Sequence, residues 1–239
     1  MILGFSDASI SVVKRGGLEV SAQADLCIHI GERVCPEIYR IVPGGYEMEM
    51  LEPAPRRGVV QLAEVVQRLR SEVWDRPEFV PHARSPQWLE LQRRWCALNA
   101  VWLVDSLHRL YPTEPVDGYC LIHGDPALSN LMVRGEYLVL TDPMPRLAYR
   151  AEIPNLPEVD CGKLVQSACG WERMLGVESS LWNEPQTLLG MIPEEMRDKA
   201  VFWGAVHLAR VALRARTKDK QRIADWAASQ SQALVRSYL

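Results

Sequence analysis

The sequence predicts an α+β protein with two unequal lobes, a β-rich N-terminal lobe and a larger helical lobe. Up to about residue 53, short β-branched and alternating runs dominate. After the Pro-rich stretch 53–55, apolar residues recur every three or four positions, as they do along one face of a helix. A strand–loop–strand insert over residues 119–141 interrupts this helical pattern. We therefore expect a lobe over 1–53 and a second lobe over 54–239.

In the first lobe, the β-branched run at 10–14 predicts a strand that closes at Gly16-Gly17. Apolar residues four positions apart predict a helix over 18–30. Residues 37–42 and 46–51 predict a hairpin that turns at Pro43-Gly44-Gly45.

In the second lobe, apolar stripes predict helices over 62–73 and from 88 to about 111, and the chain is expected to be helical from 158 to its end. Between them, the apolar runs at 119–122 and 137–141 flank a strand at 131–133. The insert is short and contains most of the chemically informative residues.

Composition narrows the class of partner. The chain has 239 residues, of which 48% are hydrophobic and 24% charged, which is typical of a globular protein with a sizeable core. Its net charge of −3 provides no overall positive field, so nucleic acid is not expected as a partner. No apolar run reaches the roughly 18 residues of a membrane span. The six irregularly spaced cysteines lack a CxxC motif and predict reduced thiols and a cytoplasmic location.

Three polar residues in the insert have the order and spacing that phosphoryl transfer requires. Asp125 follows an apolar run, Asn130 comes five residues later, and Asp142 follows the next hairpin. In this chemistry one carboxylate accepts the proton of the attacking hydroxyl. An amide oxygen and a second carboxylate hold Mg²⁺ against the phosphates.

The pattern H-x-D-x-x-x-x-N over 123–130 resembles the catalytic loop of protein kinases. Because glycine is second and Asp142 precedes proline, it is most similar to the aminoglycoside phosphotransferase and choline-kinase branch of that superfamily. The stretch 159–164 is similar to the D-L-A-K-L segment of that branch. This resemblance implies a two-lobed protein kinase-like fold with a truncated β-rich N-lobe and a mostly helical C-lobe. It further implies ATP or another nucleoside triphosphate, Mg²⁺, and transfer of the γ-phosphate to a hydroxyl of a small molecule.

The resemblance also implies a role for each matching residue of the C-lobe. Asp125 would orient and deprotonate the acceptor, while Asn130 and Asp142 would hold Mg²⁺. His123 would support the catalytic loop, and Asp160 would brace that loop from the N-terminus of a helix.

In the N-lobe, Lys14 would bind the phosphates and be held in turn by a residue of the following helix. Counting back from Val34-Cys35-Pro36 gives Gln23 for this partner, with the acidic Glu19 one turn earlier on the same face. Only 13 residues precede Lys14, so residues 5–9 would have to serve as the loop over the phosphates.

The strand at 46–51 resembles the hinge on which the adenine base lies. In this interpretation Met48 closes the back of the nucleotide pocket. The main-chain groups of Glu49 and Leu51 would face the edge of the base.

Several alternatives stay open from sequence alone. Asp125, Asn130 and Asp142 could be turn and cap residues. A metal-dependent hydrolase could use His108 with His123 and the two aspartates. A degenerate kinase fold could act as a binding or regulatory module. The basic stretch 210–222 is either a solvated helix face or a site for a phosphorylated or acidic acceptor. The identity of the acceptor, ATP or GTP as donor, and the oligomeric state stay open as well.

Overall fold

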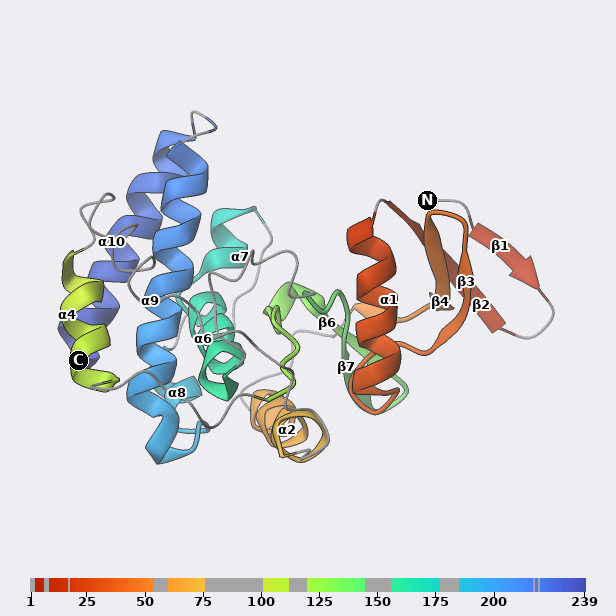
Figure 1. Ribbon diagram of the computed structural model, residues 1–239, viewed down its shortest axis with the longest axis horizontal. Coiled ribbons are helices and arrows are strands. Elements are labelled where there is room, and N and C mark those ends of the chain that lie inside the picture. The colour runs from red at the N-terminus through yellow and green to blue at the C-terminus, as the bar shows by residue number, and fades with distance from the viewer. Residues whose placement is uncertain are drawn as a thin grey trace.

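The computed structural model has two lobes joined side by side, and it confirms the α+β class and the β-rich N-lobe and helical C-lobe expected from the sequence (Figure 1). The structure describes residues 3–6, 9–16, 18–53, 60–75, 101–111, 120–144, 156–176, 185–216, 218 and 220–239.

The N-lobe contains a four-stranded antiparallel sheet with the order β1-β2-β4-β3. The strands are β1 (Leu3–Ser6), β2 (Ser9–Arg15), β3 (Ile38–Val42) and β4 (Gly45–Glu49), and α1 (Leu18–Ile30) packs against β3 and β4. The bounds of α1 agree with those predicted. Strand β1 was not predicted, and β4 ends two residues earlier than expected.

Close approach of two strands explains the glycine that opens β4. A Cβ on Gly45 would lie 2.0 Å from the carbonyl oxygen of Lys14, which is closer than any side chain can come. The neighbouring Gly44 has a φ of +69°, which a tight turn between strands requires. Gly45 therefore lets β4 lie directly against the strand that carries Lys14.

A second, three-stranded antiparallel sheet connects the lobes. Its order is β5-β6-β7, from β5 (Glu52–Pro53), β6 (Leu131–Arg134) and β7 (Tyr137–Leu140). The strand expected at 119–122 is absent from its described part, 120–122, because residues 120–127 form an irregular segment. The backbone N–H groups of His123 and Gly124 donate to a side chain instead of a neighbouring strand. The third strand comes from the segment that links the two lobes.

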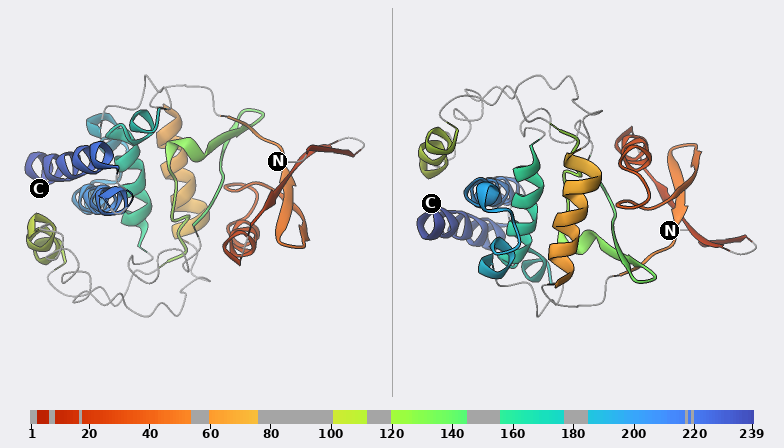
Figure 2. Two further views of the ribbon diagram at one scale, coloured as in Figure 1. Left: turned by 90° about the horizontal axis from the view of Figure 1, so that it is seen from above. Right: turned by 90° about the horizontal axis from the view of Figure 1, so that it is seen from below.

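The C-lobe is helical and arranged in layers. Figure 2 shows α6 between the pair α9 and α10 on one side and α2 with the β6–β7 hairpin on the other. Its elements are α2 (Val60–Leu69), a π-helical turn η1 (Arg70–Trp74), α4 (Val101–Leu110), the 3₁₀ turn η2 (Leu128–Asn130), α6 (Pro157–Ala168), α7 (Trp171–Met174), α8 (Pro185–Leu189), α9 (Glu194–Arg216) and α10 (Gln221–Tyr238). Of the helix expected from 88 to 111, residues 88–100 lie outside the described ranges. None of the described helices is both long and apolar enough to cross a membrane.

Helix α6 is the most enclosed element of the C-lobe. It is buried on most of its circumference, and Val159, Cys161 and Leu164 have no exposed surface. Gly162 lets it approach α9 closely, because a Cβ there would lie 2.5 Å from the Cβ of Trp203. The dense packing makes α6 a firm platform for the segment that lies over it.

Candidate active site

The segment 123–125 is fixed by one buried carboxylate. Asp160, in the first turn of α6, accepts hydrogen bonds from the backbone N–H groups of His123 (2.8 Å) and Gly124 (2.7 Å) and from the indole N–H of Trp74 (3.1 Å). Burial raises the pKa of Asp160 to about 6, although the three donors act to lower it. Gly124 has a φ of +82°, so the chain turns sharply just before Asp125.

Asp125 lies between two side chains that orient its carboxylate. Its Oδ1 is 2.8 Å from Nζ of Lys163 on α6, and its Oδ2 accepts a hydrogen bond of 3.2 Å from the amide of Asn130. The same amide donates to the Asp125 carbonyl at 2.9 Å. The Asp125 side chain retains 20% exposure, so it is held in place yet still open to a ligand.

One face of α6 holds the segment 123–130 at three points. Asp160, Lys163 and Ser167 are three and four positions apart, which puts them on the same side of the helix. Ser167 accepts the N–H of Leu128 at 3.2 Å and donates to Glu172 at 2.7 Å. Lys163 and Ser167 received no role from the sequence, although their spacing from Asp160 could have indicated that they share its face.

His123 is a buried, neutral side chain below the loop. Its Nδ1 faces the backbone N–H of Asp125 at 3.4 Å, and burial lowers the pKa of the imidazole to about 4. Its carbonyl accepts the N–H of Met144 at 2.8 Å, which connects the loop to the segment after Asp142. This geometry suits a residue that supports the loop.

Asp142 faces the N-lobe and forms an ion pair with Lys14 of β2. The two side chains are 27% exposed for Lys14 and 43% for Asp142. Asp142 has a φ of +57°, a left-handed conformation that aspartate and asparagine tolerate better than most residues. The structure thus brings Lys14 and Asp142, 128 residues apart in sequence, to one point between the lobes.

Among the described side chains, Lys14 pairs with a residue of the C-lobe and not with a residue of α1. Lys14 pairs with Asp142, while Gln23 in α1 is partly buried and its Oε1 accepts no hydrogen bond within the described part of the chain. The side chain of Glu19 lies outside the described residues. The prediction that Glu19 holds Lys14 therefore stays a prediction.

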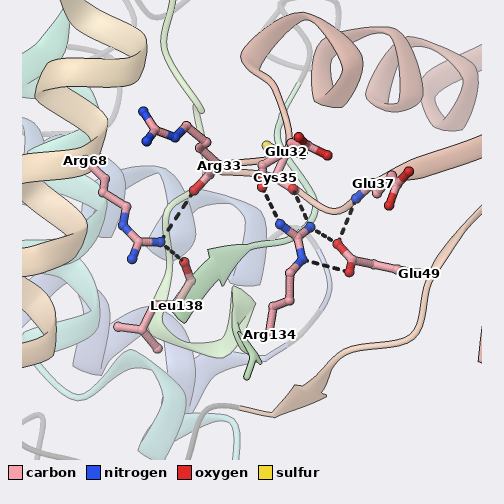
Figure 3. Close-up of polar contacts among 8 residues, drawn as sticks. All are labelled: Glu32, Arg33, Cys35, Glu37, Glu49, Arg68, Arg134 and Leu138. Carbon is pink, nitrogen blue, oxygen red and sulfur yellow. Dashed lines mark hydrogen bonds and ion pairs between the residues drawn. The ribbon is translucent and has the colours of Figure 1, made fainter. Parts of the chain in front are cut away.

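The expected hinge residues lie at the end of β4 and just beyond it. Met48 is half-buried and pairs with Val12 of β2, and Leu51 lies between β4 and β5. The Glu49 N–H donates to the carbonyl of Glu37 at 3.0 Å, so of its main-chain groups only the carbonyl could serve a base. Its side chain is buried against Arg134 (Figure 3), a contact that sequence analysis did not anticipate.

The donor atoms at one end of the hairpin suit Mg²⁺. The N–H of Thr141 donates to the Asn130 carbonyl at 2.8 Å, which places Asn130 beside the residue that precedes Asp142. Because the Asn130 amide nitrogen is bonded to Asp125, its amide oxygen is the atom available to a cation. An amide oxygen and a carboxylate are hard ligands of the kind that Mg²⁺ prefers.

The hydrolase alternative finds no ligand cluster in the described part of the chain. No group of three or more His, Cys, Asp or Glu side chains there could hold a metal ion. His108, which that alternative requires, is an exposed residue of α4.

The fold is that of kinases and phosphotransferases that act on small molecules. Similar solved structures include the choline kinase LicA from Streptococcus pneumoniae (14% identity, 99% of this chain and 89% of that chain, TM-score 0.61). A choline/ethanolamine kinase family protein from Mesorhizobium loti has 14% identity, the same coverage and a TM-score of 0.62. Spectinomycin phosphotransferase APH(9)-Ia with AMP bound has 14% identity, 95% and 89% coverage and a TM-score of 0.58. No protein-family model and no curated protein sequence matches the chain. At such identities the likeness shows the fold alone.

Proposed function

We propose that this protein is a phosphotransferase that transfers the γ-phosphoryl group of ATP, or another nucleoside triphosphate, to a hydroxyl of a small molecule. The observation that carries the proposal is the gathering of Asp125, Asn130, Asp142 and Lys14 into one site between the lobes. Proteins with this fold include the spectinomycin phosphotransferase solved with ADP and spectinomycin. We also propose a cytoplasmic location, which agrees with the free cysteines of the described residues.

Asp125 is the group that receives the acceptor's proton. The acceptor hydroxyl would lie against its carboxylate, which Lys163 and Asn130 hold in one orientation. As the hydroxyl oxygen bonds to the γ-phosphorus, the bond from that phosphorus to the bridging oxygen breaks. The proton passes to Asp125, and the nucleoside diphosphate leaves.

Lys14, together with the cation held by Asn130 and Asp142, would neutralise the negative charge of the phosphates. Lys14 would bind the α- and β-phosphates, and Asn130 and Asp142 would hold Mg²⁺. When bound, the cation neutralises charge on the phosphate oxygens. Because the protein forms no covalent bond in this reaction, positioning and electrostatic stabilisation supply most of the catalysis.

A regulatory or binding module with a degenerate kinase fold is the second candidate. It is favoured by Gln23, a neutral residue where the resemblance places the acidic partner of Lys14. Against it, none of the three residues Asp125, Asn130 and Asp142 has been replaced.

Thermal unfolding with nucleotide, followed by an assay of nucleotide consumption, distinguishes the two candidate functions. A ligand that binds only the folded state raises the midpoint, so ATP with Mg²⁺ should raise it more than ATP alone. Nucleotide consumption is then measured against a panel of small hydroxyl compounds. Acceptor-dependent consumption supports the phosphotransferase. A thermal shift without consumption favours the module, and no shift at millimolar nucleotide contradicts nucleotide binding altogether.

A further inference from the structure

The guanidinium of Arg134 connects the catalytic hairpin to the N-lobe (Figure 3). Arg134 is the last residue of β6, and its Nε donates to Oε2 of Glu49 at 2.8 Å while its Nη2 pairs with Oε1 of the same carboxylate. The remaining donors reach the loop after α1: Nη1 donates to the carbonyl of Glu32 at 2.6 Å, and Nη2 to that of Cys35 at 3.3 Å. One side chain of the hairpin thus bonds two separate segments of the N-lobe.

Both the carboxylate and the backbone N–H of Glu49 form hydrogen bonds. Its carboxylate also accepts the N–H of Glu37 at 2.8 Å, and its own N–H donates to the Glu37 carbonyl at 3.0 Å. The residue is only 9% exposed. Paired, largely desolvated charges with several hydrogen bonds hold a geometry more firmly than exposed pairs do. The end of β4 is therefore fixed relative to β6.

Arg68 of α2 extends this connection into the C-lobe. Its Nη1 donates to the carbonyl of Leu138 in β7 at 2.6 Å and approaches that of Arg33 at 3.4 Å. A cavity of about 440 Å³ lies beside these arginines. The guanidiniums that line it already contact carboxylates or carbonyls, so the cluster is built to hold segments together.

We propose that Arg134 is a positioning residue for nucleotide binding, which sets the main chain at Glu49 and Leu51 against the edge of the base. This inference rests on the proposed function. Strand β6 begins directly after Asn130, so the hairpin that carries the cation ligands also holds the hinge. The two ends of the nucleotide would then be set by one rigid element.

The test compares Arg134→Met with Arg40→Met in titrations with ADP without Mg²⁺. Arg40 also pairs with a glutamate of β4, Glu47, but the Arg40 side chain is 70% exposed and the pair does not reach the hairpin. At a temperature where all variants are folded, we expect Arg134→Met to weaken ADP binding about 10-fold, within the usual range of coupling between sites. Arg40→Met should bind ADP within twofold of the unaltered protein. Equal ADP affinity in Arg134→Met and the unaltered protein would overturn the inference while leaving the proposed function intact.

Arg134→Lys keeps the experiment decisive if Arg134→Met does not fold. Lysine retains the charge opposite Glu49 but cannot reach both carbonyls with a planar fork of donors. A smaller loss of ADP affinity with a nearly unchanged unfolding midpoint is the expected result, whereas a lower midpoint with unchanged affinity means a structural role only. If the unaltered protein binds no ADP, the proposed function and the inference both fail.

Discussion

The two carboxylates that flank the β6–β7 hairpin are held in contrasting ways. Asp125 lies over a helix, and its partner Lys163 is only 13% exposed, with the fully buried Asp160 one turn away on the same face. Asp142 faces the N-lobe, is 43% exposed, and meets a lysine from a different sheet. One end of the site belongs to a single packed lobe, and the other is shared between two.

The buried end suits a group that must be oriented in advance, and the exposed end suits a group that must exchange its partner for a ligand. A base must be aimed before the substrate arrives, and contacts fixed by a core provide that orientation without cost at the moment of reaction. In the proposed reaction, phosphates and their cation would have to enter and leave, and a half-exposed pair between the lobes could exchange Lys14 for a ligand.

The largest effect is expected at the exposed end. Asp142→Asn removes the charge at the cation but keeps the shape, and asparagine tolerates the same left-handed backbone. Turnover should be abolished, while the unfolding midpoint changes little because exposed ion pairs contribute about 0–1 kcal/mol. Turnover is measured with the acceptor found in the panel. Near-normal activity would show that Asp142 does not hold the metal.

Asp125→Asn should lower kcat by about 10²–10⁴-fold, the usual contribution of positioned proton transfer. Nucleotide affinity should stay within a few-fold, because Lys14, the metal and the hinge hold the nucleotide. A Kd titration beside the turnover rate separates the two quantities. Equal collapse of both would make Asp125 a phosphate or metal ligand, and unchanged turnover would remove the kinase mechanism.

Asp160→Ala, at the buried end of the site, should lower both the stability and the activity of the protein. Three N–H groups lose their common acceptor, which we expect to cost about 4 kcal/mol and to lower the midpoint by roughly 10 °C. The control is Asp225→Ala on α10, whose carboxylate accepts only an exposed i,i+4 hydrogen bond from Gln221 among its described contacts, and which should change stability by less than about 0.5 kcal/mol. Reduced activity with an unchanged midpoint would mean that Asp160 acts on the substrate directly.

The smallest effect concerns the pH dependence of stability. The pKa of His123 falls from 6.5 to about 4 on folding, so the unfolded chain binds this proton more tightly and His123 makes stability rise between pH 4 and 6.5. The pKa of Asp160 rises from 3.8 to about 6, so its contribution falls over nearly the same range.

The substitution His123→Asn separates the contribution of His123 to the pH dependence of stability from the opposite contribution of Asp160. The free energy of unfolding of the unaltered protein, minus that of His123→Asn, should grow by roughly 3 kcal/mol from pH 4 to 6.5 and then stay level. Urea unfolding at each pH measures it. A difference that does not change with pH would contradict the burial of a neutral imidazole.

Sequence alone predicted what is local. The helix at 18–30 and the hairpins follow from periodicity and turn residues, and Asp125, Asn130 and Asp142 could be proposed as site residues because they lie along a short stretch of chain. The kinase-like architecture came from that motif and is confirmed by the fold.

Contacts between distant segments could not be predicted in the same way. Lys163 reaches Asp125 across 38 positions and Arg134 reaches Glu49 across 85, and nothing in either local pattern names its partner. The strand expected over 119–122 is absent from the described residues 120–122, and the backbone N–H groups of His123 and Gly124 that follow donate to Asp160, a side chain 37 positions beyond His123. Strand β5 was not predicted, because two residues are too few to show the alternation of apolar and polar residues that indicates a strand.

The π-helical turn that ends α2 has a consequence for chain length. A π-turn holds one residue more than the α-helical turn it replaces, and here its last residue is Trp74, whose indole N–H donates to Asp160. Removing one residue from 70–73 would close this turn as an α-helical one and leave Trp74 near its present side of the helix, because the extra residue and the wider turn offset each other. Removing one residue within α2 (Val60–Leu69), where the helix is regular, would instead rotate Trp74 by about 100° away from that carboxylate. A deletion in α2 would thus be felt at Asp125 although no residue of the candidate site itself had changed.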